Sequence, residues 1–351
     1  MNVRNLKTLY GFDDIVCLPR YSEVESRHTP NVSTILHSRY DNKLDLQLDL
    51  PLLSANMDTV SEEAMCIAMR RNGGIGTMHR FMSIERNVEA FKTVLNESSY
   101  CLVTVGTNDW RERAEALYEA GARHFVIDIA HGHSSLMKRA VNGLRIRYGK
   151  EIMIIAGNVC TGEAVKDLTS WGADVIKVGI SSGAVCTTRL QTGHGSPQFS
   201  AILDCADVSD ADIIADGGIK NSGDILKSFV AGADAVMVGS LLAGTDETPG
   251  EVLTHDGKFY KDYRGMSSKE AQLHRKGTDD RITVSPEGIS SHIPLKGPVG
   301  PLLQELAMGL RSGMSYCNAT MLKQIALHAE WCIQTHNGYV EGTPHINRHK
   351  V

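Results

Sequence analysis

Cys186 has the surroundings that best suit chemistry in this chain of 351 residues. It lies in the segment 178–189, VGISSGAVCTTR, where small residues let a ligand approach the backbone closely. Arg189 and nearby backbone N–H groups would stabilise a thiolate, which is the form of cysteine that attacks carbon. We therefore predict that Cys186 is a nucleophile, against the alternative that it is a loop cysteine that only packs.

The other cysteines form no CxxC pair and no spacing typical of a zinc site. We expect most of them to be small buried hydrophobic residues. The histidines form no HxxxH pattern, and His131, His133 and His194 have no carboxylates at ligand spacing. The sequence therefore predicts no catalytic transition metal.

Two glycine-containing segments follow later apolar stretches, namely Asp216-Gly217-Gly218 and Gly239-Ser240. Their backbone amides could reach phosphate oxygens, and the Asp216 carboxylate could accept hydrogen bonds from two hydroxyl groups of a ribose. Ordinary turns between strand and helix would give the same pattern at either place. Together, the two segments favour phosphate binding.

Thr188 and Glu287 are candidates for proton transfer. Thr188 is close to Cys186 in the sequence, whereas Glu287 lies in a distant segment that we expect to cover the site. A glutamate in such a segment is usually a solvated charge. Its distance from the thiol does not follow from the sequence.

These residues need a scaffold, and eight short apolar runs, each spaced for one strand plus one helix, predict it. Runs that are apolar throughout are typical of a parallel sheet covered on both faces. We predict an α/β fold, a (β/α)8 TIM barrel rather than a doubly wound sheet, with the reactive loops at the C-terminal ends of its strands. The expected strands are Pro51–Ala55, Gly74–Met78, Cys101–Gly106, His124–Asp128, Ile152–Ala156, Val175–Gly179, Asp212–Asp216 and Ala235–Gly239.

The segment 244–297 is rich in Gly, Pro, Thr, Asp and Lys and shows little helical periodicity. We predict that it is an active-site lid inserted after the eighth strand. The tail predicts two C-terminal helices, Leu302–Leu310 and Ala319–Ile333, joined by a Gly-Ser turn. No accessory domain fits, so residues 1–351 are expected to form one catalytic domain.

The charge balance limits the partners. The chain has 36 basic and 41 acidic residues, a net charge of -5, which is too mild to attract nucleic acid or an anionic membrane. The N-terminus has no apolar signal region, and no apolar run approaches the roughly 20 residues that span a bilayer. We expect a cytoplasmic protein that holds a small ligand in a local site.

Several ordered motifs make the chain resemble the IMP dehydrogenase/GMP reductase family. They extend nearly from one end of the chain to the other. They are Phe12-Asp-Asp14, Asn56-Met-Asp-Thr-Val60, Gly73-Gly-Ile-Gly76, the loop around Cys186, Asp216-Gly-Gly-Ile219, Tyr263-Arg-Gly-Met-Ser267 and Gly309-Leu-Arg-Ser-Gly313.

The resemblance implies a purine-nucleotide site in which Cys186 bonds covalently to C2 of the base, while Thr188 and Glu287 assist catalysis. It also implies a homotetramer, a nicotinamide cofactor and a monovalent cation such as K+. The implied nucleotide contacts are Asp216, Gly217, Gly218, Gly239, Ser240, Tyr263, Gly265, Met266 and Ser267. The implied cofactor contacts are Ser26, Arg27, Arg80, Asp128, Ile129, Ala130, Asn158, Ser315 and Tyr316. The implied cation ligands are the backbone carbonyls of Ser181, Gly183 and Cys186.

The family has two activities, and three features favour the reductase, which uses NADPH to convert GMP to IMP and ammonia. Only the segment 81–100 separates the second and third expected strands, where dehydrogenases usually carry a CBS regulatory pair. The dehydrogenase lid has an Arg-Tyr pair whose arginine activates water, and the segment 276–284 lacks such a pair. Ser26-Arg27 and the CTTR run match the reductase pattern, in which this serine and arginine approach NADPH from a neighbouring subunit and the arginine suits its 2′-phosphate. An IMP dehydrogenase without CBS domains and a non-catalytic nucleotide-binding relative are the alternatives.

The cysteine loop departs from the family pattern at two positions. Family members mostly have Gly-x-Gly-Ser where this chain reads Ser181-Ser182-Gly183-Ala184. Ala184 therefore lacks the hydroxyl that usually contacts phosphate. Ser181 would be strained if its position requires a positive φ.

Overall fold

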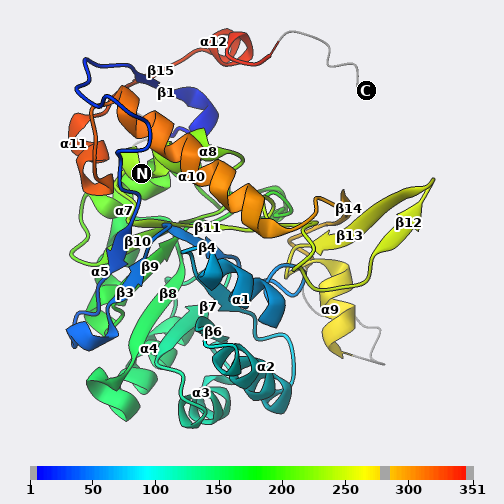
Figure 1. Ribbon diagram of the computed structural model, residues 1–351. Coiled ribbons are helices and arrows are strands. Elements are labelled where there is room, and N and C mark those ends of the chain that lie inside the picture. Colours follow the sequence, from blue (N-terminus) through cyan, green and yellow to red (C-terminus); the bar gives the residue numbers. More distant parts are fainter. Residues whose placement is uncertain (1–5, 277–284, 345–351) are drawn as a thin grey trace.

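A closed barrel of eight parallel strands forms the body of the protein in this computed structural model, which describes residues 6–276 and 285–344 (Figure 1). The strand order is β4-β11-β10-β9-β8-β7-β6-β5. The two ends of this order also meet, because the Ser54 N–H donates to the Ile75 carbonyl at 3.1 Å. The predicted (β/α)8 barrel is thus confirmed, with strand ends that differ from the expected ones by at most three residues. The strands are β4 (Leu52–Ser54), β5 (Gly76–Met78), β6 (Cys101–Val105), β7 (His124–Asp128), β8 (Met153–Val159), β9 (Val175–Val178), β10 (Asp212–Asp216) and β11 (Ala235–Val238).

Helices connect consecutive barrel strands and cover the outside of the barrel (Figure 1). Side-chain caps start several of them; at α2, for example, Ser83 Oγ accepts the Arg86 N–H at 3.1 Å. The later helix α10 packs against α8 and α1 and completes the ring. The connecting helices are α1 (Glu63–Arg71), α2 (Ile84–Asn96), α3 (Trp110–Glu119), α4 (Ser135–Tyr148) with η3 (Gly149–Glu151), α5 (Gly162–Trp171), α6 (Thr188–Thr192), α7 (Gln198–Ala206) and α8 (Ser222–Val230).

A hairpin closes one end of the barrel. Its leucines Leu36, Leu46 and Leu48 are buried against the side chains that fill the barrel interior. It lies at the N-terminal ends of the strands, because the His37 N–H donates to Asp212, the first residue of β10. The functional loops of a barrel must then lie at the opposite end. The hairpin strands are β2 (Thr34–Leu36) and β3 (Leu46–Leu48), with η2 (Asn42–Leu44) between them.

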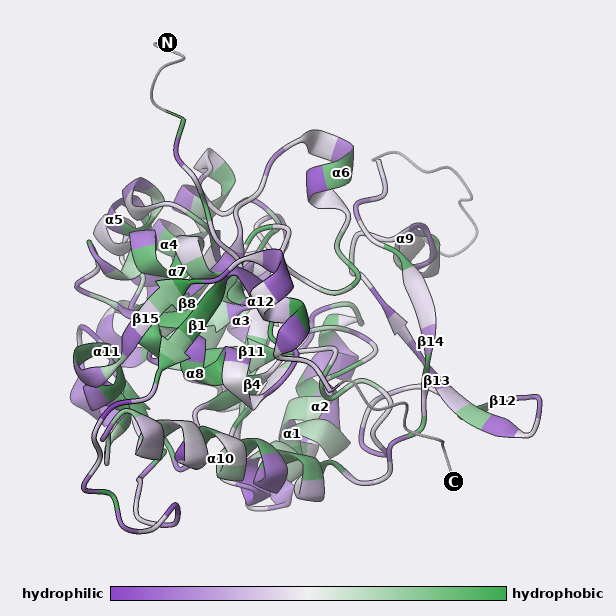
Figure 2. Cartoon of the chain, turned by 90° about the horizontal axis from the view of Figure 1, so that it is seen from above, coloured by the Kyte–Doolittle hydropathy of each residue, from purple (hydrophilic) through white to green (hydrophobic). Residues whose placement is uncertain are grey.

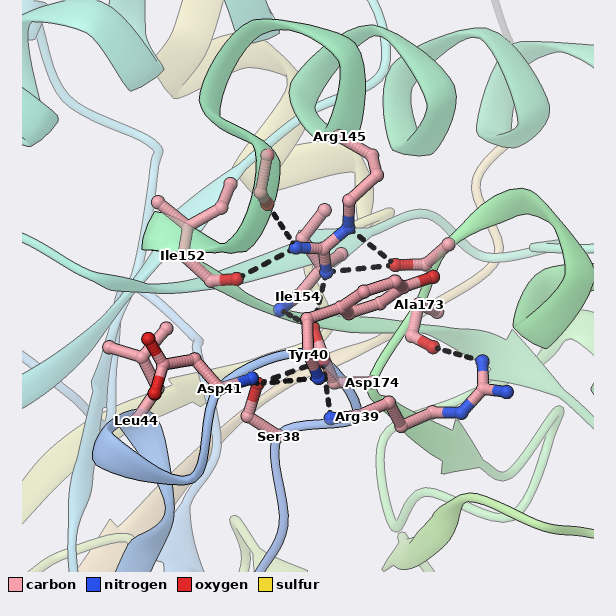
Figure 3. Close-up of polar contacts among 12 residues, drawn as sticks. Ser38, Arg39, Tyr40, Asp41, Leu44, Arg145, Ile152, Ile154, Ala173 and Asp174 are labelled. Atoms are coloured by element: carbon pink, nitrogen blue, oxygen red, sulfur yellow. Dashed lines mark hydrogen bonds and ion pairs between the residues drawn. The ribbon is translucent and has the colours of Figure 1, made fainter.

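The buried carboxylate of Asp174 fixes this hairpin to the barrel (Figure 3). It accepts the Arg39 N–H of the hairpin loop at 2.8 Å and the Ile154 N–H of β8 at 2.7 Å. It also pairs with Arg145 of α4 at 2.5 Å, and the Arg145 guanidinium lies over the ring of Tyr40. A buried carboxylate with donors from three elements is well satisfied and holds those elements at fixed positions.

The segment 244–297 is more regular than its composition predicted. It contains a three-stranded antiparallel sheet and a helix, which form an arm that extends away from the barrel (Figure 2). The hydrophobic residues gather in the barrel strands, whereas the residues of β12 are exposed. The elements of the arm are β12 (Leu253–His255), β13 (Lys258–Arg264), α9 (Lys269–Lys276) and β14 (Ser290–Pro294).

The prediction for the tail was wrong in two respects. The first helix, α10 (Val299–Tyr316), continues through the expected Gly-Ser turn, because Ser312 and Gly313 lie within it and Gly313 packs closely against Leu226. The expected second helix is instead a short helical stretch followed by β15, which pairs antiparallel with β1 near the N-terminus. No helix within residues 6–276 and 285–344 has the length and apolar character needed to cross a bilayer. The remaining elements are η1 (Phe12–Asp14), β1 (Ile15–Leu18), η4 (Leu322–Gln324), α11 (Ile325–His328), β15 (Glu330–Ile333) and α12 (His336–Glu341).

Asp234, just before β11, makes the stability of the barrel depend on pH. Burial, reinforced by the negative charge of Asp212, raises the pKa of Asp234 from 3.8 to about 6. The folded protein therefore binds this proton more tightly than the unfolded chain does. The resulting stability is complete below the unfolded pKa of 3.8 and is lost as the pH rises through about 6.

We predict that Asp234→Asn stabilises the protein above pH 7, because the amide is neutral and its oxygen can still accept the Ile213 N–H. The gain in free energy of unfolding should be about 1 to 2 kcal/mol. Urea denaturation at pH 8 and at pH 4.5 measures it, and the gain should be smaller at the lower pH. The control Asp210→Asn alters an exposed carboxylate. An equal gain at both pH values would contradict the assignment.

Candidate functional site

A pocket opens at the C-terminal ends of the barrel strands, opposite the β2–β3 hairpin. Its walls come from the ends of five strands, from the loops after β4, β7, β9 and β10, and from the arm. The residues that line it are Ala55, Asn56, Met57, Asp128, Ile129, Ala130, Asn158, Lys177, Gly179, Ile180, Ser181, Ser182, Gly183, Val185, Cys186, Thr188, Asp216, Gly217, Tyr263, Gly265, Met266, Ser267 and Glu287.

Most of the residues singled out in the sequence meet in this pocket, including all three catalytic candidates. Eight others do not line it. Two of these still lie at its edge: a Cβ added at Gly239 would lie 3.1 Å from the Tyr263 hydroxyl, and one at Gly218 would lie 3.5 Å from the Ser182 side chain. The predicted site residues outside the lining are Ser26, Arg27, Arg80, Gly218, Gly239, Ser240, Ser315 and Tyr316.

The half-buried thiol of Cys186 has a hydroxyl beside it. Its Sγ lies 3.2 Å from Oγ1 of Thr188, within hydrogen-bonding distance for sulfur. The loop turns tightly before the cysteine, because the Cys186 N–H donates to the Gly183 carbonyl at 3.0 Å. Of the three carbonyls expected to hold a cation, that of Gly183 is therefore already engaged. Arg189 is exposed, and its N–H donates to Ser181 Oγ at 3.0 Å.

Backbone hydrogen bonds bring the distant Glu287 to the cysteine loop. The Thr187 N–H donates to the Glu287 carbonyl at 2.9 Å, and the Glu287 N–H donates to the Ser267 carbonyl at 3.0 Å. On the next residue but one, the Ile289 N–H donates to the Val185 carbonyl at 3.0 Å. The segment around Glu287 is thus clamped between the cysteine loop and the end of β13, and its glutamate lines the same pocket as the thiol.

Lys177 joins two carboxylates at the mouth of the barrel, and it was not among the predicted site residues. Its side chain is 1% exposed, and its Nζ lies 2.8 Å from Asp128 Oδ1 and 2.6 Å from Asp216 Oδ2. Asn158 Nδ2 donates to the same oxygen of Asp216 at 2.9 Å. Burial alone would lower the pKa of Lys177, but attraction to the two carboxylates outweighs it and raises that pKa. A lysine inside the apolar strand β9 is the signal that would have revealed it.

Two glycines allow the strand ends to approach each other at the pocket. Gly179 has φ +151°, and a Cβ there would lie 1.9 Å from the Asp216 carbonyl oxygen. Gly217 has φ +93°, and a Cβ there would lie 2.6 Å from Ser182 Oγ. Any larger residue at either position would push Asp216 or the cysteine loop out of place.

Five cofactor candidates lie outside the pocket lining. They are Arg80 and a surface group formed by Ser26, Arg27, Ser315 and Tyr316. Arg80 is near enough to Asp128 to lower the pKa of that carboxyl, although Lys177 has the larger effect. Arg27 and Tyr316 contact each other on the surface, where Arg27 Nη2 lies 3.2 Å from the Tyr316 hydroxyl. The structure thus brings this group together without bringing it to the pocket.

Ser181 adopts the conformation that would strain it. Its φ is +68°, in the left-handed region where residues with a side chain are disfavoured. Its hydroxyl oxygen accepts the Arg189 N–H at 3.0 Å, which offsets part of that cost. Ala184 is exposed and has no hydroxyl, but the neighbouring Ser182 places one within 3.1 Å of the Asp216 carbonyl.

Comparisons with known proteins find one family throughout. A family model described as "IMP dehydrogenase / GMP reductase domain" matches residues 9–345. An inosine-5′-monophosphate dehydrogenase from Methanocaldococcus jannaschii is 33% identical over 97% of this chain and 95% of that protein. A GMP reductase from Leishmania major is 31% identical over 95% of this chain and 96% of that protein. Among solved structures, a cysteine-to-alanine variant of GMP reductase from Trypanosoma brucei, in complex with guanosine 5′-monophosphate, has a TM-score of 0.89 at 29% identity and covers 98% of this chain and 99% of that one.

We predict different losses of stability for two substitutions of Ser181. Ser181→Ala loses the hydrogen bond to Arg189 but keeps the positive φ, so the protein should lose about 1 kcal/mol of stability. Ser181→Gly loses the same bond but relieves the backbone, so its stability should stay within about 0.5 kcal/mol of the parent. Thermal and urea denaturation of both variants measure the difference. Equal losses would show that φ at this position costs nothing.

Proposed function

Because this chain belongs to the IMP dehydrogenase / GMP reductase family, whose members are oxidoreductases that use a nicotinamide cofactor, we propose that it is a GMP reductase. The proposed reaction converts GMP and NADPH to IMP, ammonia and NADP+. The observation that carries it is the contact between Cys186 Sγ and Thr188 Oγ1, with Glu287 held in the same pocket by the cysteine loop. A protein that only bound nucleotides would have no use for this arrangement.

The nucleotide would lie with its base over Cys186. Asp216 is suited to accept hydrogen bonds from the ribose, and the left-handed backbone at Gly217 leaves its amide free of side-chain obstruction for phosphate. In this arrangement the arm covers the base. The proposed phosphate contacts are Gly217, Gly218, Gly239 and Ser240, and the proposed base contacts are Tyr263, Gly265, Met266, Ser267 and Glu287.

In the proposed reaction the Cys186 thiolate attacks C2 of guanine. The amino group on C2 takes up a proton and leaves as ammonia, so that the cysteine remains bonded to C2. Thr188 is the nearest hydroxyl to pass that proton, with Glu287 as its partner in the pocket. A hydride is then added to C2, the C2–S bond breaks, and IMP is released with the thiolate restored.

The residues on the far side of the pocket fit a nicotinamide. Asn158 donates through Nδ2 to Gly179 and Asp216, while its Oδ1 is buried and has no hydrogen-bond partner among the described residues. This oxygen is placed to accept a carboxamide N–H. Asp128, Ile129 and Ala130 line the same side, and Arg80 lies behind Asp128. When bound, the cofactor supplies the hydride.

The surface group of Ser26, Arg27, Ser315 and Tyr316 would contact the other end of NADPH from a neighbouring copy of the chain. Their separation from the pocket within one chain is what such an arrangement requires. An arginine there suits a 2′-phosphate through its planar fork of donors. We accordingly propose a homotetramer, with K+ at the carbonyls of Ser181, Gly183 and Cys186.

The alternative activity is that of an IMP dehydrogenase, since relatives of both names match this chain at similar identity. The segment 276–284 has no Arg-Tyr pair to activate water, which favours the reductase. Residues 277–284 of that segment lie outside the described part of the chain. A lid role for residues 244–297 is part of the same proposal.

The absorbance of reduced nicotinamide tests the proposed function. Purified protein with GMP and NADPH should consume NADPH and release one ammonia for each cofactor oxidised. The same protein with IMP and NAD+ should produce no NADH. Production of NADH from IMP would instead establish the dehydrogenase. If neither mixture reacted, the non-catalytic alternative would replace both.

We predict that Cys186→Ala lowers turnover by about a thousandfold or more while GMP binding changes by no more than about threefold, because the thiol contributes a bond rather than most of the contacts. Calorimetry with GMP and the NADPH assay measure the two effects. Cys332→Ala, in β15, is the matched control and should behave like the parent. Residual turnover close to that of the parent would reject the nucleophile.

A further inference from the structure

We propose that Lys177 is a positioning residue that holds Asp128 and Asp216 as a matched pair of acceptors, one for each ligand of the pocket. The inference rests on the proposed function, because it takes Asp216 as the ribose contact and Asp128 as a residue on the nicotinamide side. Nothing in the sequence motifs assigns a role to Lys177.

The placement of Lys177 is the first argument. It lies on β9, which is separated from β7 by β8 and is adjacent to β10. Its ammonium nevertheless reaches Asp128 at the end of β7 and Asp216 at the end of β10, at 2.8 and 2.6 Å. A side chain can join strands that are not neighbours only from inside the barrel mouth. Gly157 of β8 makes room for it, because a Cβ there would lie 2.7 Å from the Cβ of Lys177.

The electrostatics are the second argument. Two carboxylates that contact one ammonium are close neighbours, and in a poorly solvated site such a pair would retain a shared proton. Burial would raise the pKa of Asp128, but Lys177 outweighs it and the pKa is lowered. Arg80 and the Asn56 side chain also favour the Asp128 carboxylate. On the other side, burial, reinforced by the negative charge of Asp216, raises the pKa of the Tyr263 phenol. Lys177 is the one cation in contact with both carboxylates among the described residues.

A functional consequence follows for both ligands. A carboxylate that accepts hydrogen bonds from sugar hydroxyls must stay unprotonated and keep its orientation. Lys177 contacts Oδ1 of Asp128 and Oδ2 of Asp216. Because a carboxylate can accept about four hydrogen bonds, both groups keep acceptor capacity for a ligand besides their bonds to Lys177, Asn56 and Asn158. The distance between the two carboxylates is thereby set by one side chain, and with it the distance between the nucleotide and the cofactor.

The test compares Lys177→Met, which is one atom shorter and carries no charge, with the double variant Lys177→Met, Asp128→Asn. We expect the single variant to weaken GMP binding and to raise KM for NADPH, each by about tenfold. As the pH is lowered, kcat/KM for GMP should begin to fall at a higher pH in the single variant than in the parent, because the carboxylate pair now retains a proton. The double variant removes the repulsion between the carboxylates of Asp128 and Asp216. GMP binding and the pH at which activity falls should therefore return toward the values of the parent, while KM for NADPH stays high.

The control is Lys261→Met. Lys261 is 4% exposed, so it is also a buried lysine, but the groups that it contacts are the backbone carbonyls of Asp246 and Thr248 rather than Asp128 and Asp216. The variant Lys261→Met should change the stability of the protein without moving the pH profile of kcat/KM for GMP. Unchanged GMP binding and pH profile in Lys177→Met, or no recovery in the double variant, would overturn the proposal. A parent protein inactive in both nucleotide assays would instead reject the proposed function, and calorimetry with GMP separates these outcomes.

Discussion

Closure of the parallel sheet is the constraint on which the rest of this structure depends. The hydrogen bond from Ser54 to Ile75 joins the two ends of the strand order and leaves no open edge. All eight strands then end at one rim, and residues far apart in the chain, such as Met57, Asp128 and Cys186, line one pocket. The β2–β3 hairpin and Asp174 fix the opposite rim, so the two ends of the barrel have different tasks.

Backbone contacts, rather than side chains, hold the cysteine loop, the end of β10 and the arm in position around the pocket. Gly179 and Gly217 let the ends of β9 and β10 lie closer than any side chain would permit. Two strand-like hydrogen bonds then couple the arm to the pocket. The Thr187 N–H of the cysteine loop donates to the Glu287 carbonyl, and the Ile289 N–H of the arm donates to the Val185 carbonyl of that loop. Because these bonds use backbone groups, they hold Glu287 in the pocket lining without using its carboxylate.

The sequence predicts the barrel well because its strands are short, apolar and regularly spaced. His124–Asp128 and Asp212–Asp216 form strands with the expected ends, and the residues that follow them line the pocket. Local pattern failed where long-range pairing decides the structure. The residues Glu330–Ile333 form a strand because β1 lies beside them, which no local periodicity reveals. Proximity of Glu287 to Cys186 likewise depends on a fold of the arm that composition does not encode. The apolar residues of β9 predict a strand but do not predict a site role for Lys177, because a single charged residue leaves the apolar pattern intact.

The β2–β3 hairpin, which closes the barrel at the N-terminal ends of the strands, has a consequence for how ligands reach the pocket. Leu36, Leu46 and Leu48 pack against the side chains that fill the barrel interior, so the described residues leave no passage through the barrel to that end. Ligands of the pocket therefore enter and leave at the end of the barrel where the strands have their C-terminal ends. Under the proposed reaction, a nucleotide bonded to Cys186 and the cofactor share this end of the barrel. The substrate, the cofactor and both products would then exchange with solvent on the same side of the barrel, so the two ligands compete for one approach to the strand ends.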